Sequence, residues 1–150
     1  MLVISGALFS LSAQGALPKN LPAFKLMSID GKEVSTADYK GKAILINFWA
    51  TWCPPCVREI PDLIKIHTEE ANLVVLGISV DLEKEKVAPF AKSKGINYPV
   101  LFGNTDVVST FGGIRFIPQS FLYAPNGKLI KKFEGLVSEK ELKAALKEIN

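Results

Sequence analysis

Apolar and polar residues alternate in blocks along the chain, and each block has the period of a strand or a helix. Two near-continuous apolar runs, residues 43–49 and 73–80, are typical of central strands that are covered on both faces. Between them, residues 54–71 carry apolar side chains at helical spacing, with a stripe formed by Ile60, Leu63, Ile64 and His67. The pattern predicts a strand, a helix and a second strand in succession.

Weaker patterns predict the remaining elements. Asp30-Gly31 is a strong turn signal between residues 24–29 and 32–34, and it predicts an N-terminal β-hairpin. Ser138 and Glu141 form a capping box that predicts the start of the last helix. We expect further strands at 98–102, 120–124 and 128–134, and helices at 83–94, 105–111 and 138–149. This order predicts an α/β fold with a mixed sheet.

The first residues have a different character. Residues 2–16 are apolar or small except for Gln14 and include no charged side chain, as in the apolar part of an export signal. Ala13-Gln14-Gly15 could supply a cleavage site, although no basic segment precedes the run, which is too short to span a bilayer alone. We expect residues 1–17 to be an export signal or the remnant of a membrane anchor, with a hydrophobic tail or a first core element as the alternative. Residues 18–150 then form a single domain.

Composition excludes some classes of function. The chain has 150 residues, of which 48% are hydrophobic and 22% charged, as in an ordinary globular domain. The net charge of +3 is spread over scattered lysines and glutamates without a basic stripe. Binding to nucleic acid is therefore not expected.

The only two cysteines, Cys53 and Cys56, lie between the first buried strand and the helix that follows it. A disulfide between them closes too short a loop to stabilise the fold much, so the pair indicates redox chemistry or a metal. A helix N-terminus favours an anion, which predicts a lowered pKa and a nucleophilic role for Cys53. Cys56, one turn further, is the expected resolving thiol. Pro54 and Pro55 suit the first turn and stiffen the ring.

Two segments carry a family resemblance. Phe48-Trp49-Ala50-Thr51-Trp52-Cys53-Pro54-Pro55-Cys56, with Pro61 five residues beyond, resembles the active-site segment of the thioredoxin fold. Phe116-Ile117-Pro118-Gln119-Ser120-Phe121-Leu122-Tyr123 resembles the cis-proline loop of that family and the strand after it. Within this superfamily, the chain is similar to the TlpA/ResA-like group of exported thiol–disulfide oxidoreductases. Three features carry this similarity: the pattern Cys56-x-x-Glu59-x-Pro61, the N-terminal hairpin and the extra strand–helix material in residues 73–111.

The resemblance covers residues 21–150 and implies a thioredoxin-like fold, an α/β fold in which helices flank a central mixed β-sheet. It also implies an N-terminal β-hairpin and a strand–helix insertion. It implies an enzyme that exchanges a Cys53–Cys56 disulfide with protein substrates. We expect this enzyme to be a monomer and to use no cofactor or metal. The resemblance implies that the enzyme reduces disulfides of other proteins, often in cytochrome c maturation, and that a membrane thiol-transfer protein supplies the electrons. The expected location is the periplasm or another extracytoplasmic compartment. A disulfide-forming oxidant is the alternative.

Glu59 is the third predicted catalytic residue. It lies three residues after Cys56, on the same helix face. Ordinary thioredoxins have a buried acid in the central strand as proton acceptor, whereas the matching residue here, Asn47, cannot titrate. Because the position of Glu59 is commonly acidic in the TlpA/ResA-like group, we expect Glu59 to accept the proton of Cys56, directly or through a water, and to have a raised pKa. The alternative is a solvated glutamate paired with a lysine or arginine.

The remaining predicted site residues concern the substrate. The resemblance implies a cis Pro118 that faces the disulfide and leaves the backbone of Ile117 free to pair with an extended substrate. Trp52 is expected at an exposed apolar rim beside Cys53, where it binds substrate together with Pro54 and Pro55. Asp81, at the end of the second buried strand, is expected to be a cap or a solvated residue.

Two other functions compete. Thioredoxin-like copper chaperones use CxxxC and a distant histidine, whereas His67 lies eleven residues after Cys56, about 16 Å along a helix. Two thiolates alone could still bind Cu(I) or zinc. Peroxidases of the peroxiredoxin type share the hairpin but have Thr or Ser three residues before the reactive cysteine, where this chain has Ala50.

Overall fold

The computed structural model describes residues 16–149. The predicted export signal falls on residues 1–17, so nearly all of it lies outside the described residues. Within residues 16–149, no helix combines the length and the apolar character needed to cross a membrane.

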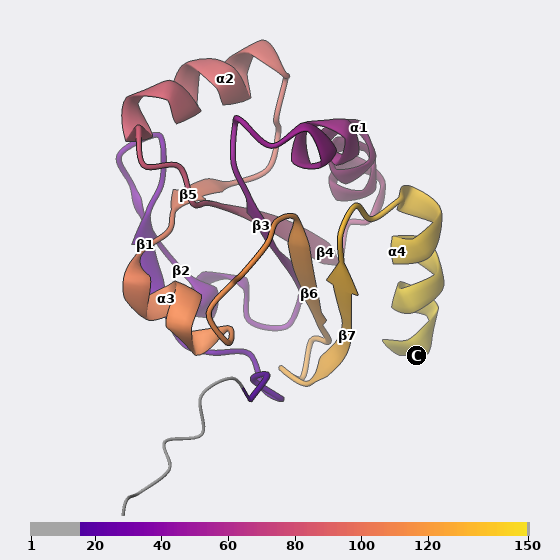
Figure 1. Cartoon of the computed structure of the whole chain (residues 1–150). Helices are drawn as coiled ribbons and strands as arrows, with labels where there is room; N and C mark the ends of the chain where they lie inside the picture. Colours follow the sequence, from indigo (N-terminus) through magenta and orange to yellow (C-terminus); the bar gives the residue numbers. More distant parts are fainter. Residues whose placement is uncertain (1–15, 150) are drawn as a thin grey trace, which may run out of the picture.

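A mixed sheet forms the centre of the described domain, with strand order β5-β4-β3-β6-β7 (Figure 1). Strands β3 (Ala43–Trp49) and β4 (Leu73–Ser79) are parallel and buried along their whole length, as their continuous apolar sequences predict. Strand β5 (Val100–Phe102) continues the parallel half. Strands β6 (Gln119–Tyr123) and β7 (Leu129–Glu134) form the antiparallel half, which confirms the predicted mixed sheet.

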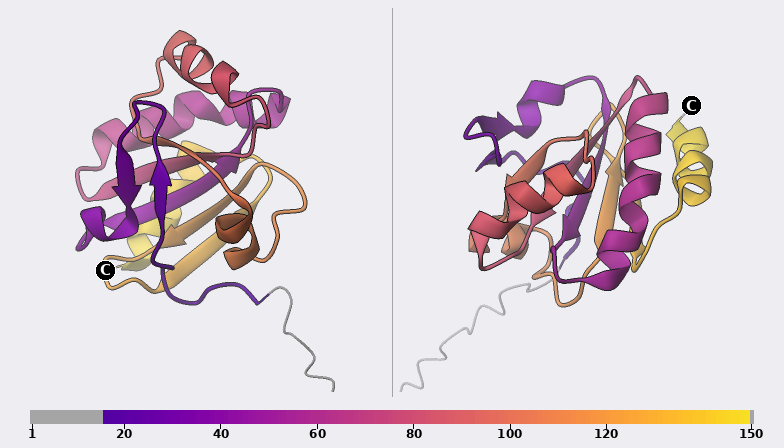
Figure 2. Two further views of the ribbon diagram at one scale, coloured as in Figure 1. Left: turned by 90° about the vertical axis from the view of Figure 1, so that its left-hand side faces the viewer. Right: turned by 90° about the horizontal axis from the view of Figure 1, so that it is seen from above.

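Helices α1 (Pro54–Glu69) and α4 (Glu139–Leu146) lie side by side on one face of the sheet (Figure 2). A 3₁₀ turn, Lys147–Ile149, continues α4. The predicted helix at 83–94 is a 3₁₀ turn, Lys84–Lys86, followed by α2 (Val87–Ser93), which packs in the same apolar cluster as α1.

The opposite face is covered by α3 (Thr105–Thr110) and by the N-terminal hairpin of β1 (Lys25–Met27) and β2 (Glu33–Ser35). A 3₁₀ turn, Thr36–Tyr39, follows the hairpin. The predicted hairpin and the insertion between β4 and β6 are therefore confirmed.

The pleat of β3 decides which side chains reach the helix that carries the cysteines. Phe48 points to the hairpin side, whereas Leu45 and Trp49 belong to the cluster under α1. Asn47 alternates with Phe48 and therefore faces α1. On α1 itself, the buried face consists of Cys56, Glu59, Ile60, Leu63 and Ile66. Of the predicted stripe, Ile60 and Leu63 are buried, whereas Ile64 and His67 are half-buried at its edge.

Candidate active site

Cys53 caps the N-terminus of α1 and forms a disulfide with Cys56 across a Cα–Cα distance of 5.3 Å. Pro54 and Pro55 occupy the first two helical positions, where a backbone N–H would have no partner inside the helix. The N–H of Cys56 donates to Sγ of Cys53 over 3.3 Å. In the reduced protein, this donor and the positive end of the helix dipole stabilise a thiolate at Cys53.

The two sulfurs differ in access. Both cysteines are almost fully buried, with exposed fractions of 4% for Cys53 and 1% for Cys56. Cys53 nevertheless lines an apolar groove of about 510 Å³, and the lining does not include Cys56. The groove is lined by the neighbours of Cys53 in the chain, Trp52, Pro54 and Pro55. The rest of the lining consists of Val80, Val108, Ile114, Arg115, Phe116 and Ile117. A partner sulfur that approaches through the groove reaches Cys53.

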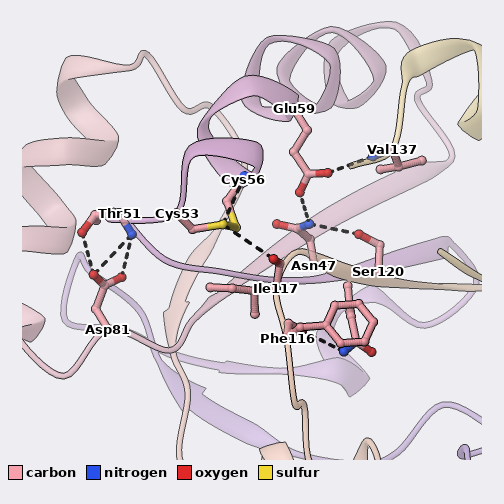
Figure 3. The surroundings of a disulfide bond; sticks show 11 residues. Asn47, Thr51, Cys53, Cys56, Glu59, Asp81, Phe116, Ile117, Ser120 and Val137 are labelled. Carbon is pink, nitrogen blue, oxygen red and sulfur yellow. Dashed lines mark hydrogen bonds between the residues drawn. A yellow bond between two sulfur atoms is a disulfide. The ribbon is translucent and has the colours of Figure 1, made fainter. Parts of the chain in front are cut away.

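The loop before β6 closes the site opposite α1. The Ile117–Pro118 peptide bond is cis, as the resemblance implied. The carbonyl oxygen of Ile117 lies 3.8 Å from Sγ of Cys53 (Figure 3). Pro118 is buried and its own carbonyl oxygen accepts from the N–H of Gly135, which holds the loop against β7. The structure thus brings Ile117 and Pro118 to the disulfide.

Two aromatic side chains stand at the mouth of the groove. Trp52 is 67% exposed and Phe116 is 51% exposed, although both are large and apolar. The predicted exposed position of Trp52 is confirmed. The sequence marks Phe116 only as part of the cis-proline motif, because nothing in the neighbouring residues indicates on which side of the loop its side chain lies.

Glu59 is buried under α1, with 1% of its surface exposed. Its Oε1 accepts from Nδ2 of Asn47 at 2.6 Å, and its Oε2 accepts from the backbone N–H of Val137 at 3.1 Å. The same Nδ2 also donates to Oγ of Ser120 at 3.0 Å (Figure 3). The alternative of a solvated glutamate in an ion pair is therefore wrong.

Burial raises the pKa of Glu59 from 4.5 to about 7. The hydrogen bonds from Val137 and Asn47 act in the opposite direction, and the nearby charge of Asp62 raises the pKa further. Loss of solvation outweighs the two donors, as predicted. A carboxyl group with this pKa gains and loses a proton near neutral pH, one helical turn from Cys56.

Asp81 corrects a prediction. It is 8% exposed and caps no helix: it accepts hydrogen bonds from the backbone N–H and the hydroxyl of Thr51, and from the hydroxyl of Ser79. Thr51 lies two residues before Cys53, so a buried carboxylate holds the loop that leads into the cysteines. The sequence shows a polar residue at the end of a strand, but not the partner 30 residues away that buries it.

His67 lies at the edge of the core. Its Nδ1 accepts from the N–H of Val75 at 3.2 Å, and its ring packs edge-on against Tyr98. Burial, together with the charge of Lys42, lowers the pKa of His67. The imidazole therefore joins α1 to β4 in its neutral form.

Comparison with known proteins agrees with this geometry. Residues 18–132 match the AhpC/TSA family. The chain is 32% identical over 136 residues to the thiol–disulfide oxidoreductase ResA of Geobacillus thermodenitrificans, a match that covers 89% of this chain and 78% of the relative.

Solved structures extend the comparison to the fold. A thiol:disulfide interchange protein of the thioredoxin family from Chlorobium tepidum superimposes with a TM-score of 0.81 at 34% identity, over 89% of this chain and 97% of that one. The exposed lipoprotein thioredoxin Etrx1 of Streptococcus pneumoniae superimposes with a TM-score of 0.70 at 32% identity, over 85% and 99% of the two chains. The chain therefore belongs to the AhpC/TSA family of thioredoxin-like proteins, as one of its ResA-like thiol–disulfide oxidoreductases.

Proposed function

We propose that the protein reduces disulfides of partner proteins outside the cytoplasm, with Cys53 as nucleophile and Cys56 as resolving thiol. The observation that carries this proposal is the position of the Cys53–Cys56 disulfide: it sits at a helix N-terminus, and only Cys53 of the pair lines the apolar groove. The helix end favours the thiolate, and the groove directs a partner to it.

The exchange has two steps that balance in electrons and protons. The Cys53 thiolate attacks one sulfur of the substrate disulfide, forms a mixed disulfide and releases the first substrate thiolate. The Cys56 thiolate then attacks Sγ of Cys53, which restores the Cys53–Cys56 disulfide and releases the second substrate thiolate. The substrate gains two electrons, and an external dithiol must reduce the enzyme again.

Glu59 supports the second step in this proposal. Cys56 must lose its proton to become a nucleophile, and an ordinary thiol, with a pKa of about 8.5, holds most of its protons at neutral pH. Glu59, on the same buried face of α1 and with a pKa of about 7, accepts that proton directly or through a water.

We propose that the groove binds an extended segment of the substrate. Trp52 and Phe116 offer exposed aromatic surface in the lining of the groove, and Pro54 and Pro55 make the lining rigid beside Cys53. The backbone of Ile117, held next to Sγ of Cys53 by the buried Pro118, would pair with an extended chain.

The proposed location rests on two observations. The relative from Streptococcus pneumoniae is an exposed lipoprotein, and residues 2–16 of this chain carry no charge and are apolar or small except for Gln14. A reductant outside the cytoplasm needs a supply of electrons, and we propose that a membrane thiol-transfer protein provides them. The process that the family resemblance implies is cytochrome c maturation. Fractionation of cells that express the full chain tests the location, which would be wrong if the protein is recovered in the cytoplasm.

A trapping experiment tests the exchange. Cys56→Ser removes the resolving thiol, so Cys53 is expected to remain joined to its substrate in a mixed disulfide that a reducing agent cleaves. The double variant Cys53→Ser/Cys56→Ser is the matched control. Capture by Cys56→Ser no greater than by the double variant would count against a protein-disulfide substrate.

The reduction potential tests the direction of the reaction. A value near that of thioredoxin, about −270 mV, supports a reductant, whereas a value near that of DsbA, about −120 mV, indicates an oxidant. Equilibration of the Cys53–Cys56 disulfide with glutathione or thioredoxin measures it.

A further inference from the structure

The two carboxylate oxygens of Glu59 have partners of different kinds. Oε2 accepts from the backbone N–H of Val137, which is always a donor. Oε1 accepts from Nδ2 of Asn47, which belongs to a side-chain amide with a donor end and an acceptor end of nearly equal size. Only the second partner can change from donor to acceptor.

This difference matters because Glu59 is buried and gains a proton near neutral pH. A protonated carboxyl group has an O–H that needs an acceptor, and a buried donor without one is costly. A proton on Oε2 would face the N–H of Val137. A proton on Oε1 would face the NH₂ group of Asn47 in the orientation that the structure shows.

Ser120 removes the remaining obstacle. It is the cross-strand neighbour of Asn47, and its Oγ accepts from the same Nδ2 at 3.0 Å. A hydroxyl group donates as readily as it accepts, by rotation about its C–O bond. If the amide presents its oxygen instead, that oxygen can accept from Glu59 and from Ser120 together.

We propose that the side-chain amide of Asn47 turns by half a rotation when Glu59 changes its protonation state, and that Asn47 is thereby a positioning residue for the proton. With Glu59 ionised, Nδ2 donates to Oε1 and to Ser120. With Glu59 protonated on Oε1, the O–H of Glu59 and the hydroxyl of Ser120 both donate to Oδ1 of Asn47, while Val137 still donates to Oε2. Each state leaves Glu59 fully hydrogen-bonded.

The turn also changes what faces the cysteines. In Figure 3 the oxygen of the Asn47 amide is directed away from Ser120, toward the side on which the disulfide lies. After the turn the NH₂ group takes that direction, so a proton that leaves Cys56 for Glu59 brings a donor toward the thiolate it leaves behind. This consequence rests on the proposed function of Glu59, but the turn itself does not.

The other ionisable groups around Glu59 move the pH of the turn and leave its pairing unchanged. Asp62 on α1 raises the pKa of Glu59. Burial, and to a smaller extent the charge of Glu59, raises the pKa of Tyr98, which lies just before β5. Cys56 on α1 titrates only in the reduced protein. The oxidised protein therefore isolates the response of Asn47 to Glu59.

The test uses the full chain in its disulfide form, labelled with ¹⁵N and ¹³C for NMR. Above about pH 8 we expect a coupling through the hydrogen bond between Nδ2 of Asn47 and Cδ of Glu59, and below about pH 6 we expect it to disappear. The Nδ2 resonance is expected to shift with the same midpoint as Cδ of Glu59. A carboxyl group that titrates while the coupling persists would overturn the proposal.

Glu59→Gln supplies a matched variant that cannot titrate. Its amide oxygen can accept from Val137 and its NH₂ group can only donate toward Asn47, as the protonated acid does. We expect the Nδ2 resonance of Asn47 in this variant at about pH 9 to match that of the wild type at about pH 5. A resonance that matches the wild type at high pH would contradict the turn.

Because no cysteine titrates in the disulfide form, these results do not depend on disulfide exchange. If Cys56→Ser captures no substrate while Asn47 turns as expected, only the proposed function fails. If capture succeeds while the coupling persists at all pH values, only the turn fails.

Discussion

The carboxylate of Asp81 holds Thr51 by two groups, the backbone N–H at 3.1 Å and the hydroxyl at 2.6 Å (Figure 3). Asp81 follows the end of β4, and Thr51 lies in the loop between β3 and α1 that carries Trp52 and Cys53. The contact therefore joins the edge of the sheet to the segment that presents the nucleophile.

We expect Asp81→Ala to destabilise the oxidised protein by about 2–4 kcal/mol, because it leaves the half-buried donors of Thr51 and the buried hydroxyl of Ser79 without their acceptor. Thr51→Val removes one hydroxyl and is expected to cost about 1 kcal/mol. Urea denaturation measures both. Glu83→Ala, at an exposed neighbour that forms an ion pair with Lys86, is the control. An equal midpoint for Asp81→Ala and the control would show that the contact adds no stability.

The pKa of Glu59 predicts how stability depends on pH. Its pKa is raised from 4.5 to about 7 in the folded state, so the folded protein binds the proton more tightly than the unfolded chain. The contribution of Glu59 to stability is therefore greatest below pH 4.5, and about 3 kcal/mol of it is lost as pH rises from 4.5 through about 7. Glu59→Gln cannot lose a proton and lacks this decrease. Urea denaturation of both oxidised proteins from about pH 4 to about pH 8 measures the difference, and parallel profiles would contradict the assignment.

The two cysteines should differ in reactivity once reduced. Cys53 gains a donor from the N–H of Cys56 and the field of the helix N-terminus, so we expect its pKa to lie below the usual value of about 8.5. At about pH 7, iodoacetamide should modify Cys53 in Cys56→Ser at least tenfold faster than Cys56 in Cys53→Ser. Equal rates would exclude the proposed difference between nucleophile and resolving thiol.

Substitution of the two exposed aromatic residues of the groove, Trp52 and Phe116, is expected to lower activity without lowering stability. Trp52→Ala and Phe116→Ala are each expected to lower kcat/KM toward a protein disulfide about tenfold, because each removes apolar contact area at the centre of docking. The midpoint of urea denaturation should change little, since both side chains are largely exposed. Met27→Ala, at a similarly exposed residue on the hairpin, is the control. Unchanged kcat/KM in both groove variants would remove the groove from substrate binding.

Much of the fold is predictable because its signals are local. The buried strands β3 and β4 appear as continuous apolar runs, and the hairpin appears through Asp30-Gly31, whose glycine has a φ of +76°. The helix after β4 was predicted as one element, but its first turn is 3₁₀ and α2 begins only at Val87. Lysine and glutamate in that turn favour helices in general and do not specify where the helix begins.

The sequence by itself determined the chemistry: one pair of cysteines, their place at the start of a helix, and an acid on the same helix face. Those features depend on neighbours in the chain and on helical spacing, which local sequence encodes. The tertiary structure alone decided which sulfur meets the groove, that Asp81 is buried against Thr51, and that Asn47, Ser120 and Val137 surround Glu59. These contacts join residues that are far apart in the chain. They form only when the strands pair and α1 packs on the sheet, because that packing brings the residues together and removes water from around them.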